Sequence, residues 1–291
     1  MALRKLFLFS YLFVIYSFGE CSTVVSAFGY HERVGIPLAE EVLKTERLSA
    51  VSRIVGGSQV SIASAIPHQA GILVTLTTGW TSICGGSLVS NTRVLTAAHC
   101  WNDGSVQARL FTIVLGSLTI FTGGTRQETT DVTVHPNWNA AAITHDIAIV
   151  RITSVAFTNN IQPVPLPVIS DAHQDFSGLS AVASGYGKTS DAQSGFPTTT
   201  SLYHTTVSII TNAVCQRSFD VDIHGSHLCT AGTGGVGTCD GDSGGPLTVL
   251  WNNRRTLVGI TSFGLGEGCQ RGLPSVFTRV TAFLGWITPN L

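Results

Sequence analysis

Residues 241–246 read GDSGGP, and they are the strongest local signal in this chain of 291 residues. A serine hydroxyl is a poor nucleophile unless a neighbouring base removes its proton, so Ser243 needs a partner. Its glycine neighbours allow tight backbone turns and leave room for a substrate carbonyl. The backbone N–H groups of Gly241 and Ser243 can then stabilise the oxyanion that forms when a serine attacks an acyl group. The stretch therefore indicates a nucleophile loop rather than an ordinary glycine-rich turn.

The base that we expect for Ser243 is His99, in the run LTAAHC at residues 95–100. The small residues there allow close packing, and Cys100 can anchor the segment. The orienting carboxylate that we expect is Asp146, which opens the apolar run DIAIV at residues 146–150. A partly buried carboxylate needs a hydrogen-bond partner, and the ring N–H of His99 is a suitable one. Taken alone, the run fits an ordinary aspartate at the start of a strand equally well.

Short β-rich runs separated by Gly, Asn, Pro and Ser fill the chain from Ile54 onward. Many short strands at close spacing predict an all-β sandwich or barrel. Only the C-terminal end shows helical periodicity, with apolar residues at positions 280, 283, 284 and 287. The proline-rich run at residues 162–167 predicts an extended connector between two halves.

The N-terminal end is typical of a secretory signal peptide. Arg4 and Lys5 precede an apolar run over residues 6–18, which is short for a transmembrane helix of about 20 residues. A signal anchor left in place is the alternative interpretation. Small residues allow cleavage after Ala27 or after Gly19. We favour Ala27, because that cut removes Cys21 and leaves six of the seven cysteines, an even number.

Residues 28–53 differ from the β-rich sequence that follows, because they are rich in charged side chains and contain no cysteine. This composition predicts a removable activation pro-segment. The formal net charge of −1 and the lack of a basic cluster give no case for nucleic-acid binding. No CxxC pair occurs, so disulfides are a better interpretation of the cysteines than a zinc site.

Five motifs, in this order, resemble the chymotrypsin-like serine proteases, and the resemblance covers residues 54–291. They are RIVGG at 53–57, CGGSL at 84–88, LTAAHC at 95–100, HDIA at 145–148 and CDGDSGGPL at 239–247. The order His, Asp, Ser along the chain also fits this family. The resemblance implies a catalytic triad of His99, Asp146 and Ser243, with an oxyanion hole made by Gly241 and Ser243. Digestive chymotrypsins of insects are the most similar type.

The resemblance also implies the fold and the activation mechanism. We expect an all-β protein with two six-stranded antiparallel β-barrels, at about 54–165 and about 166–279, and a short C-terminal helix at about 280–288. Activation would follow cleavage after Arg53, which frees the amino group of Ile54 to pair with Asp242. The implied disulfides are Cys84–Cys100, Cys215–Cys229 and Cys239–Cys269.

The family also implies where the side chain before the scissile bond binds. The base of that pocket is Gly237, and its walls are Gly264 and Ser275. No acid lies at the base, so we expect a preference for large apolar residues, which gain most from burial. Ser262, Phe263 and Gly264 are expected to pair with an extended substrate strand. Glycine at the base also occurs in broad and collagen-cleaving members, so that alternative stays open.

Two features depart from the common pattern of the family. Phe263 occupies a position that is often Trp, and Asp240 lies at the pocket entrance, where we expect it to disfavour acidic substrates.

A neutral pocket does not readily accept Arg53, so a separate trypsin-like protease is the expected activator. The other expected partners are protein and peptide substrates and protein inhibitors, and we expect a monomer with no membrane contact after signal removal.

The ratio of lysine to arginine suggests the pH at which the protein works. Residues 54–291 contain one lysine, Lys188, against nine arginines, and arginine keeps its charge at high pH. We expect a secreted digestive enzyme of an alkaline gut lumen, although compositional drift would give the same bias.

No cofactor or metal is expected, since the loop 116–128 that holds calcium in some relatives offers only Glu128 as an acid. The alternative functions are a non-catalytic homologue that binds a partner and a regulatory protease of narrow specificity.

Overall fold

The computed structural model describes residues 24–25, 27–48, 58–62, 65–189, 191, 201–266 and 268–291. The predicted signal peptide up to residue 23, Arg53 and Ile54 lie outside these described residues. Within the described ranges, no helix is long and apolar enough to span a membrane.

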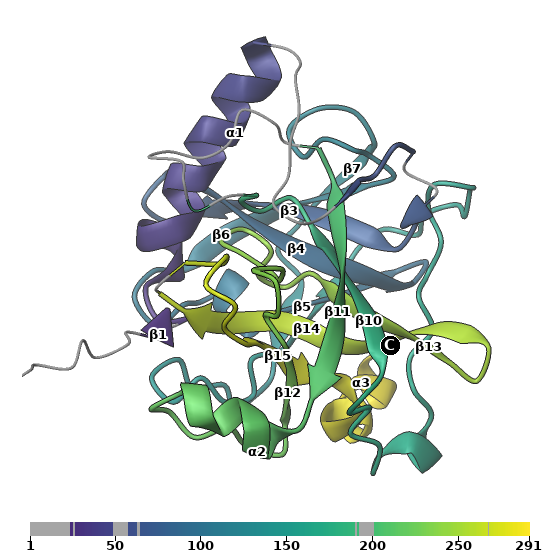
Figure 1. Ribbon diagram of the computed structural model, residues 1–291. Helices are drawn as coiled ribbons and strands as arrows, with labels where there is room; N and C mark the ends of the chain where they lie inside the picture. Colours follow the sequence, from purple (N-terminus) through teal and green to yellow (C-terminus); the bar gives the residue numbers. More distant parts are fainter. Residues whose placement is uncertain are drawn as a thin grey trace, which may run out of the picture.

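Seven antiparallel strands between residues 69 and 151 form the first sheet, in the order β7-β6-β3-β4-β5-β9-β8 (Figure 1). Alternating side chains of these strands, such as Ile72, Leu88 and Phe111, are fully buried in one apolar core. The strands are β3 (Gln69–Leu76), β4 (Thr81–Ser90), β5 (Arg93–Thr96), β6 (Ala108–Leu115), β7 (Thr125–Thr129), β8 (Val132–Val134) and β9 (Ala148–Arg151).

The second sheet closes on itself, because β14 pairs with both β13 and β15. Its core contains Leu228, Leu247 and Phe277, all fully buried. Two short strands attach to the ring: β1 (Val24–Val25) pairs with β14, and β2 (Ser58–Gln59) pairs with β11. The ring consists of β10 (Ser180–Gly185), β11 (Tyr203–Ile210), β12 (His227–Thr230), β13 (Pro246–Trp251), β14 (Arg254–Leu265) and β15 (Ser275–Arg279).

These two barrel-like sheets confirm the predicted all-β fold. The second sheet has the six strands that we expected in its ring. The first has seven, because residues 130–131 interrupt one segment whose first part, β7, pairs with β6 and whose second part, β8, pairs with β9. The predicted C-terminal helix is also confirmed. It consists of a 3-10 turn (Val280–Phe283), α3 (Leu284–Ile287) and a last 3-10 turn (Thr288–Asn290).

The expectation that only the C-terminal end is helical is wrong. A π-helix (His31–Gly35) runs directly into α1 (Ile36–Leu48), and a short helix α2 (Asn212–Cys215) precedes β12. Apolar residues at positions 30, 34, 38 and 42 lie on one side of the N-terminal helical segment and are buried. The charged residues between them hide this stripe in a composition count. Figure 1 shows α1 in purple along one side of the molecule, where it packs against β4.

The three disulfides implied by the family resemblance are present: Cys84–Cys100, Cys215–Cys229 and Cys239–Cys269. The first joins β4 to the turn that carries His99, so it fixes that turn to the first sheet. The third joins residues on either side of the Ser243 loop and β14. The disulfides therefore anchor both segments that carry the predicted chemistry.

Candidate active site

His99 and Asp146 are buried side by side where two neighbouring strands meet. β5 leads into a 3-10 turn (Ala98–Cys100) that carries His99, and Asp146 lies two residues before β9, which pairs with β5. Nδ1 of His99 lies 2.8 Å from Oδ2 of Asp146. The backbone amide of His99 donates to Oδ1 of the same carboxylate at 2.9 Å. Two contacts to one carboxylate fix the imidazole ring in a single orientation.

Asp146 is held by the second sheet as well. The Ser262 hydroxyl donates to its Oδ2 at 2.6 Å, and the Thr278 hydroxyl donates to its backbone carbonyl at 2.7 Å. Burial alone would raise the pKa of Asp146, but the charge and hydrogen bonds of His99, together with the Ser262 hydrogen bond, hold that pKa below its ordinary value. The carboxylate therefore stays ionised beside the imidazole. The sequence placed Ser262 only at the substrate edge, and no local pattern indicated its hydrogen bond to Asp146.

The loop that carries Ser243 crosses between the two sheets. The Ser243 carbonyl accepts from the Gly85 amide of β4 at 2.7 Å, and the Gly244 amide donates to the Thr261 carbonyl of β14 at 2.8 Å. Gly244 has a φ of +79°, and a Cβ there would lie 2.3 Å from Oγ1 of Thr96. Only glycine fits such a close approach. The glycines of the GDSGGP stretch thus allow the loop to lie against both sheets.

Ser243 and His99 contact the same side chain, Tyr30. The Tyr30 ring lies 4.8 Å from the His99 ring in an edge-on arrangement, and its hydroxyl donates to the Ile83 carbonyl at 2.7 Å. Burial raises the pKa of Tyr30, while a hydrogen bond from the Ser243 side chain acts in the opposite direction. Nε2 of His99 is buried and makes no hydrogen bond within the described part of the chain. Sequence reasoning assigned Tyr30 to the pro-segment and gave it no contact with the site.

A cavity beside Ser243 contains four of the five predicted substrate-binding residues: Ser262, Phe263, Gly264 and Ser275. A Cβ at Gly264 would meet nothing within 4 Å, so this wall is open. The fifth residue, Gly237, does not line this cavity but a neighbouring pocket, and a Cβ on Gly237 would be 3.0 Å from the Ser275 hydroxyl. Ala27, Tyr30 and Val34 reach into the same cavity from the N-terminal segment.

The only acid that lines this cavity among the described residues is Asp240. Its carboxylate is 2.6 Å from the Lys188 ammonium, and both side chains are about a quarter exposed. The pair offsets the charge that Asp240 would otherwise present to a substrate. The cavity therefore has no unpaired acid with which to attract a basic side chain.

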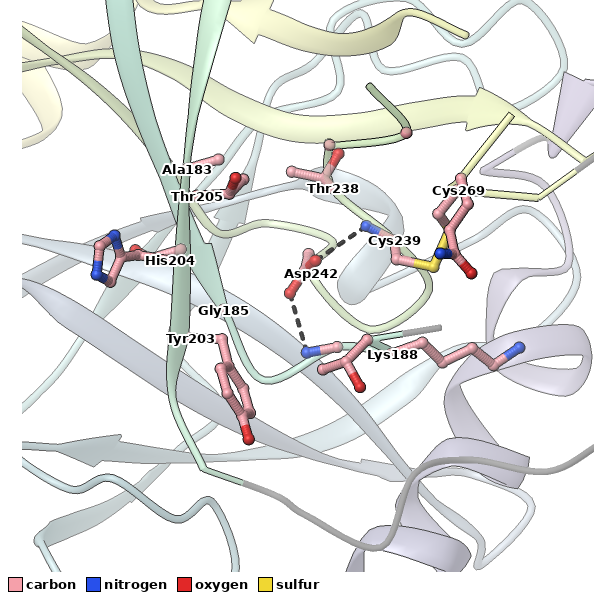
Figure 2. Close-up of a pocket in the computed structure, with 16 residues that line it drawn as sticks. Ala183, Gly185, Lys188, Tyr203, His204, Thr205, Thr238, Cys239, Asp242 and Cys269 are labelled. Atoms are coloured by element: carbon pink, nitrogen blue, oxygen red, sulfur yellow. Dashed lines mark hydrogen bonds between the residues drawn. A yellow bond between two sulfur atoms is a disulfide. The ribbon is translucent and has the colours of Figure 1, made fainter. Parts of the chain in front are cut away.

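The neighbouring pocket contains Asp242, the predicted partner of the Ile54 amine. Figure 2 shows its carboxylate at the centre of the pocket, close to the Cys239–Cys269 disulfide. Oδ1 accepts from the Gly187 amide and Oδ2 from the Cys239 amide, each at 2.9 Å. Desolvation raises the pKa of Asp242 to about 6, although the two amide hydrogen bonds act to lower it. No cation pairs with this carboxylate among the described residues.

Two groups of side chains bring three potential metal ligands together in the described ranges. They are Cys84, His99 and Cys100, and Asp191, Cys239 and Cys269. All four cysteines are paired in disulfides and do not provide the thiolates that bind zinc. Neither group is a metal centre.

Comparisons with known proteins agree on the relationship. Residues 54–287 match the family model described as Trypsin. The chain is 40% identical over 238 residues to Brachyurin of Leptuca pugilator, which covers 80% of this chain and 96% of that protein. It is 39% identical over 225 residues to Serine protease 1 of Drosophila melanogaster, covering 77% and 81%. The solved structure of HL collagenase matches with a TM-score of 0.74 and 33% identity, over 81% of this chain and 98% of that one.

Proposed function

Because the chain belongs to the trypsin family of serine proteases, we propose that it is a secreted endopeptidase with His99, Asp146 and Ser243 as its catalytic triad. The observation that carries the proposal is the hydrogen-bonded chain Ser262–Asp146–His99, buried next to the Ser243 loop. Such an arrangement gives an imidazole a fixed tautomer with Nε2 directed toward the nucleophile. The presence of all three proposed triad residues also argues against the alternative of a non-catalytic homologue.

The reaction divides into two acyl transfers. Oγ of Ser243 attacks the carbonyl carbon of the peptide bond while Nε2 of His99 takes the hydroxyl proton. His99 then donates that proton to the departing amine, which leaves an ester on Ser243. Water, deprotonated by His99, then attacks the ester, and His99 returns that proton to Oγ of Ser243 as the Oγ–acyl bond breaks and the acid leaves. Asp146 remains ionised throughout and stabilises the imidazolium in both steps.

The negative charge that forms on the carbonyl oxygen needs preorganised donors. We assign this role to the backbone amides of Gly241 and Ser243. Gly241 has a φ of +94°, a backbone conformation that glycine adopts without strain. Loss of one donor of this kind typically lowers the rate about 10²–10³-fold.

Activation depends on Asp242. We assign cleavage after Arg53 as the activating step, performed by a separate trypsin-like protease. The new amino group of Ile54 would enter the pocket in Figure 2 and pair with the Asp242 carboxylate. A cation there would lower the pKa of Asp242 from about 6 and hold the adjacent Gly241–Ser243 loop in its catalytic shape.

We assign a preference for large apolar residues before the scissile bond. Gly264 leaves one pocket wall open, and the Lys188–Asp240 pair leaves no free acid to bind Arg or Lys. Burial of apolar side-chain surface then drives binding, at about 25 cal/mol per Å². Collagen cleavage is the second candidate, because one structural neighbour is named a collagenase. The lysine-poor composition favours a digestive role in an alkaline gut lumen.

The test is to activate the precursor with immobilised trypsin and to profile cleavage of a peptide library and of triple-helical collagen. Cleavage after Phe, Tyr and Leu, abolished by Ser243→Ala, is expected. Cleavage after Arg or Lys would contradict the assigned preference, and collagen cleavage would favour the second candidate. If the Ser243→Ala protein cleaved the library as fast as the wild type, the assigned nucleophile would be wrong.

A further inference from the structure

The N-terminal segment, residues 28–48, is helical from Tyr30 onward and lies beside His99 and Ser243, since Tyr30 contacts the His99 ring and lines a cavity with Ser243. Four of its side chains, spaced four residues apart, are buried as deeply as the core: Tyr30 (4% exposed), Val34 (6%), Leu38 (1%) and Val42 (2%). This spacing puts them on one face of the helical segment. Val34 belongs to the core cluster of the first sheet, and Leu38 and Val42 pack with Ile83 of β4. The segment is therefore packed on the protease domain along its whole length.

Tyr30 occupies the space in which the reaction would take place. The centroid of its ring lies 4.8 Å from that of the His99 ring, and its phenol lies beside the Ser243 side chain, with which it lines the same cavity. The nucleophile thus has a phenol beside it, while Nε2 of His99 has no hydrogen-bond partner among the described residues. A substrate carbonyl must approach Ser243 through this same space. Tyr30 and a substrate consequently exclude each other.

Two further apolar side chains cover the rest of the site. Leu38 lies so close to the oxyanion loop that a Cβ on Gly241 would be 2.0 Å from Cδ2 of Leu38. Val34 lines the cavity that also contains Ser243 and Ser275. The same helical face therefore covers the nucleophile, the proposed oxyanion hole and the substrate pocket.

Polar contacts fix the two ends of the segment. The His31 amide donates to Oδ2 of Asp103 at 2.8 Å, and Nδ1 of His31 lies 2.9 Å from the Ser82 hydroxyl. At the other end, Glu46 accepts from the Ile120 and Phe121 amides and from the Thr122 hydroxyl, each at 2.9 Å. Hydrogen bonds to a carboxylate from several donors are stronger than neutral ones. The contacts specify one position of the helix on the domain.

β1 (Val24–Val25) pairs with β14 at Gly264 and Leu265, the edge expected to bind substrate, but at Ser243 itself the geometry of residues 30–48 is that of an inhibitor and not of a substrate. A protease binds its substrate as an extended strand along a sheet edge, which aligns the scissile carbonyl with the nucleophile. The segment that faces Ser243 is helical, and helical carbonyls accept hydrogen bonds from their own chain. It places a phenol, which has no acyl carbon, against the Ser243 side chain. Ser243 therefore has no bond to cleave at this point.

We propose, given the proposed protease function, that residues 28–48 are a built-in inhibitor that binds the mature domain and blocks its active site until it dissociates. All three disulfides lie between residues 84 and 269, so among the described residues no covalent bond ties this segment to the domain except the chain itself. Cleavage after Arg53 then leaves it bound only by non-covalent contacts. Release after the cut is aided by the loss of the high effective concentration that the chain connection provided.

The test adds a synthetic peptide of residues 28–53 to the trypsin-activated enzyme after the natural segment has been removed by size exclusion. Competitive inhibition of a small chromogenic substrate is expected. The Tyr30→Ala peptide should inhibit at least tenfold more weakly. The matched control is the Glu40→Ala peptide, because Glu40 is exposed on the same helix and alanine keeps its helicity. That control should inhibit like the wild-type peptide.

A direct binding measurement separates this inference from the proposed function. Fluorescence anisotropy of the labelled peptide with trypsin-cleaved Ser243→Ala protein reports docking without any turnover. An active enzyme that the peptide neither inhibits nor binds would overturn the inference and leave the protease function intact. Binding of the peptide to a protein without activity would support docking and contradict the proposed function. Equal loss of inhibition with Tyr30→Ala and Glu40→Ala would also overturn the inference.

Discussion

The precursor contains two pockets beside the Ser243 loop, and they differ in what occupies them. The cavity beside Ser243 is lined on one side by Tyr30 and Val34 of the N-terminal segment, whereas the pocket at Asp242 holds a carboxylate with no cation among the described residues. The cavity beside Ser243 is blocked by residues 28–48 until this segment dissociates. The Asp242 pocket lacks the Ile54 amine that we expect to bind there. One cut after Arg53 removes both restraints, because it frees the Ile54 amine and separates the segment from the protease domain.

The largest expected effect concerns the Asp242 pocket. Asp242→Asn in the trypsin-cleaved enzyme should lower kcat/KM about 10²–10⁴-fold, because breaking a buried ion pair typically costs about 3–5 kcal/mol. Its circular dichroism spectrum should match that of the wild type. Turnover at the wild-type rate would show that Asp242 does not control the site.

The docking of residues 28–48 should respond to pH. Burial lowers the pKa of docked His31 to about 4 from an ordinary 6.5, with Asp103 acting to raise it and the nearby His99 acting to lower it further. A lowered pKa disfavours protonation in the docked state, so docking is strongest above pH 6.5 and weakens as the pH falls toward 4.

For the peptide of residues 28–53, this shift corresponds to affinity roughly 30-fold weaker at pH 5 than at pH 7.5. Anisotropy with trypsin-cleaved Ser243→Ala protein measures it without interference from turnover. A His31→Asn peptide keeps a hydrogen-bonding group but cannot gain a proton, so its affinity should change much less. Identical pH profiles for the two peptides would exclude His31 as the cause.

Gly35 tests how closely the segment approaches β4. A Cβ on Gly35 would lie 1.8 Å from the Ser82 hydroxyl, which is already hydrogen-bonded to His31. The Gly35→Ala peptide should therefore inhibit about tenfold more weakly, even though alanine favours helix by about 1 kcal/mol. Lys44→Ala, at an exposed position, is the control. Tighter inhibition by Gly35→Ala would mean that helix propensity, and not contact, limits docking.

The smallest expected effect is at Glu46. Glu46→Gln keeps one acceptor oxygen but loses the charge that strengthens three hydrogen bonds. We expect inhibition about fivefold weaker, measured as the inhibition constant of the peptide. The effect should shrink at high salt if the charge is responsible.

Much of this arrangement follows from the sequence. The β-rich runs and the five motifs were sufficient for the two-sheet fold, the three disulfides and the pairing of His99 with Asp146. These features depend on local patterns that recur across a family. The Ser262 hydrogen bond to Asp146 was not predictable in this way, because it joins residues 116 positions apart on different sheets.

The docked helix was missed for a different reason. Charged residues dominate the composition of residues 28–53, while the apolar stripe from Tyr30 to Val42 has only four members. Its partners are distributed over β4, the His99 turn and the Ser243 loop, which only the fold brings together. Composition identified a separate segment but contained no information about where that segment binds.

The most direct test of this account is the rate at which a fluorophosphonate labels Ser243, followed by mass spectrometry in three states of the protein. We predict slow labelling of the uncut precursor, rapid labelling at Ser243 once the cut chain is freed of residues 28–53, and slow labelling again when the peptide is restored. Equal rates in all three states, or label on another residue, would contradict the account.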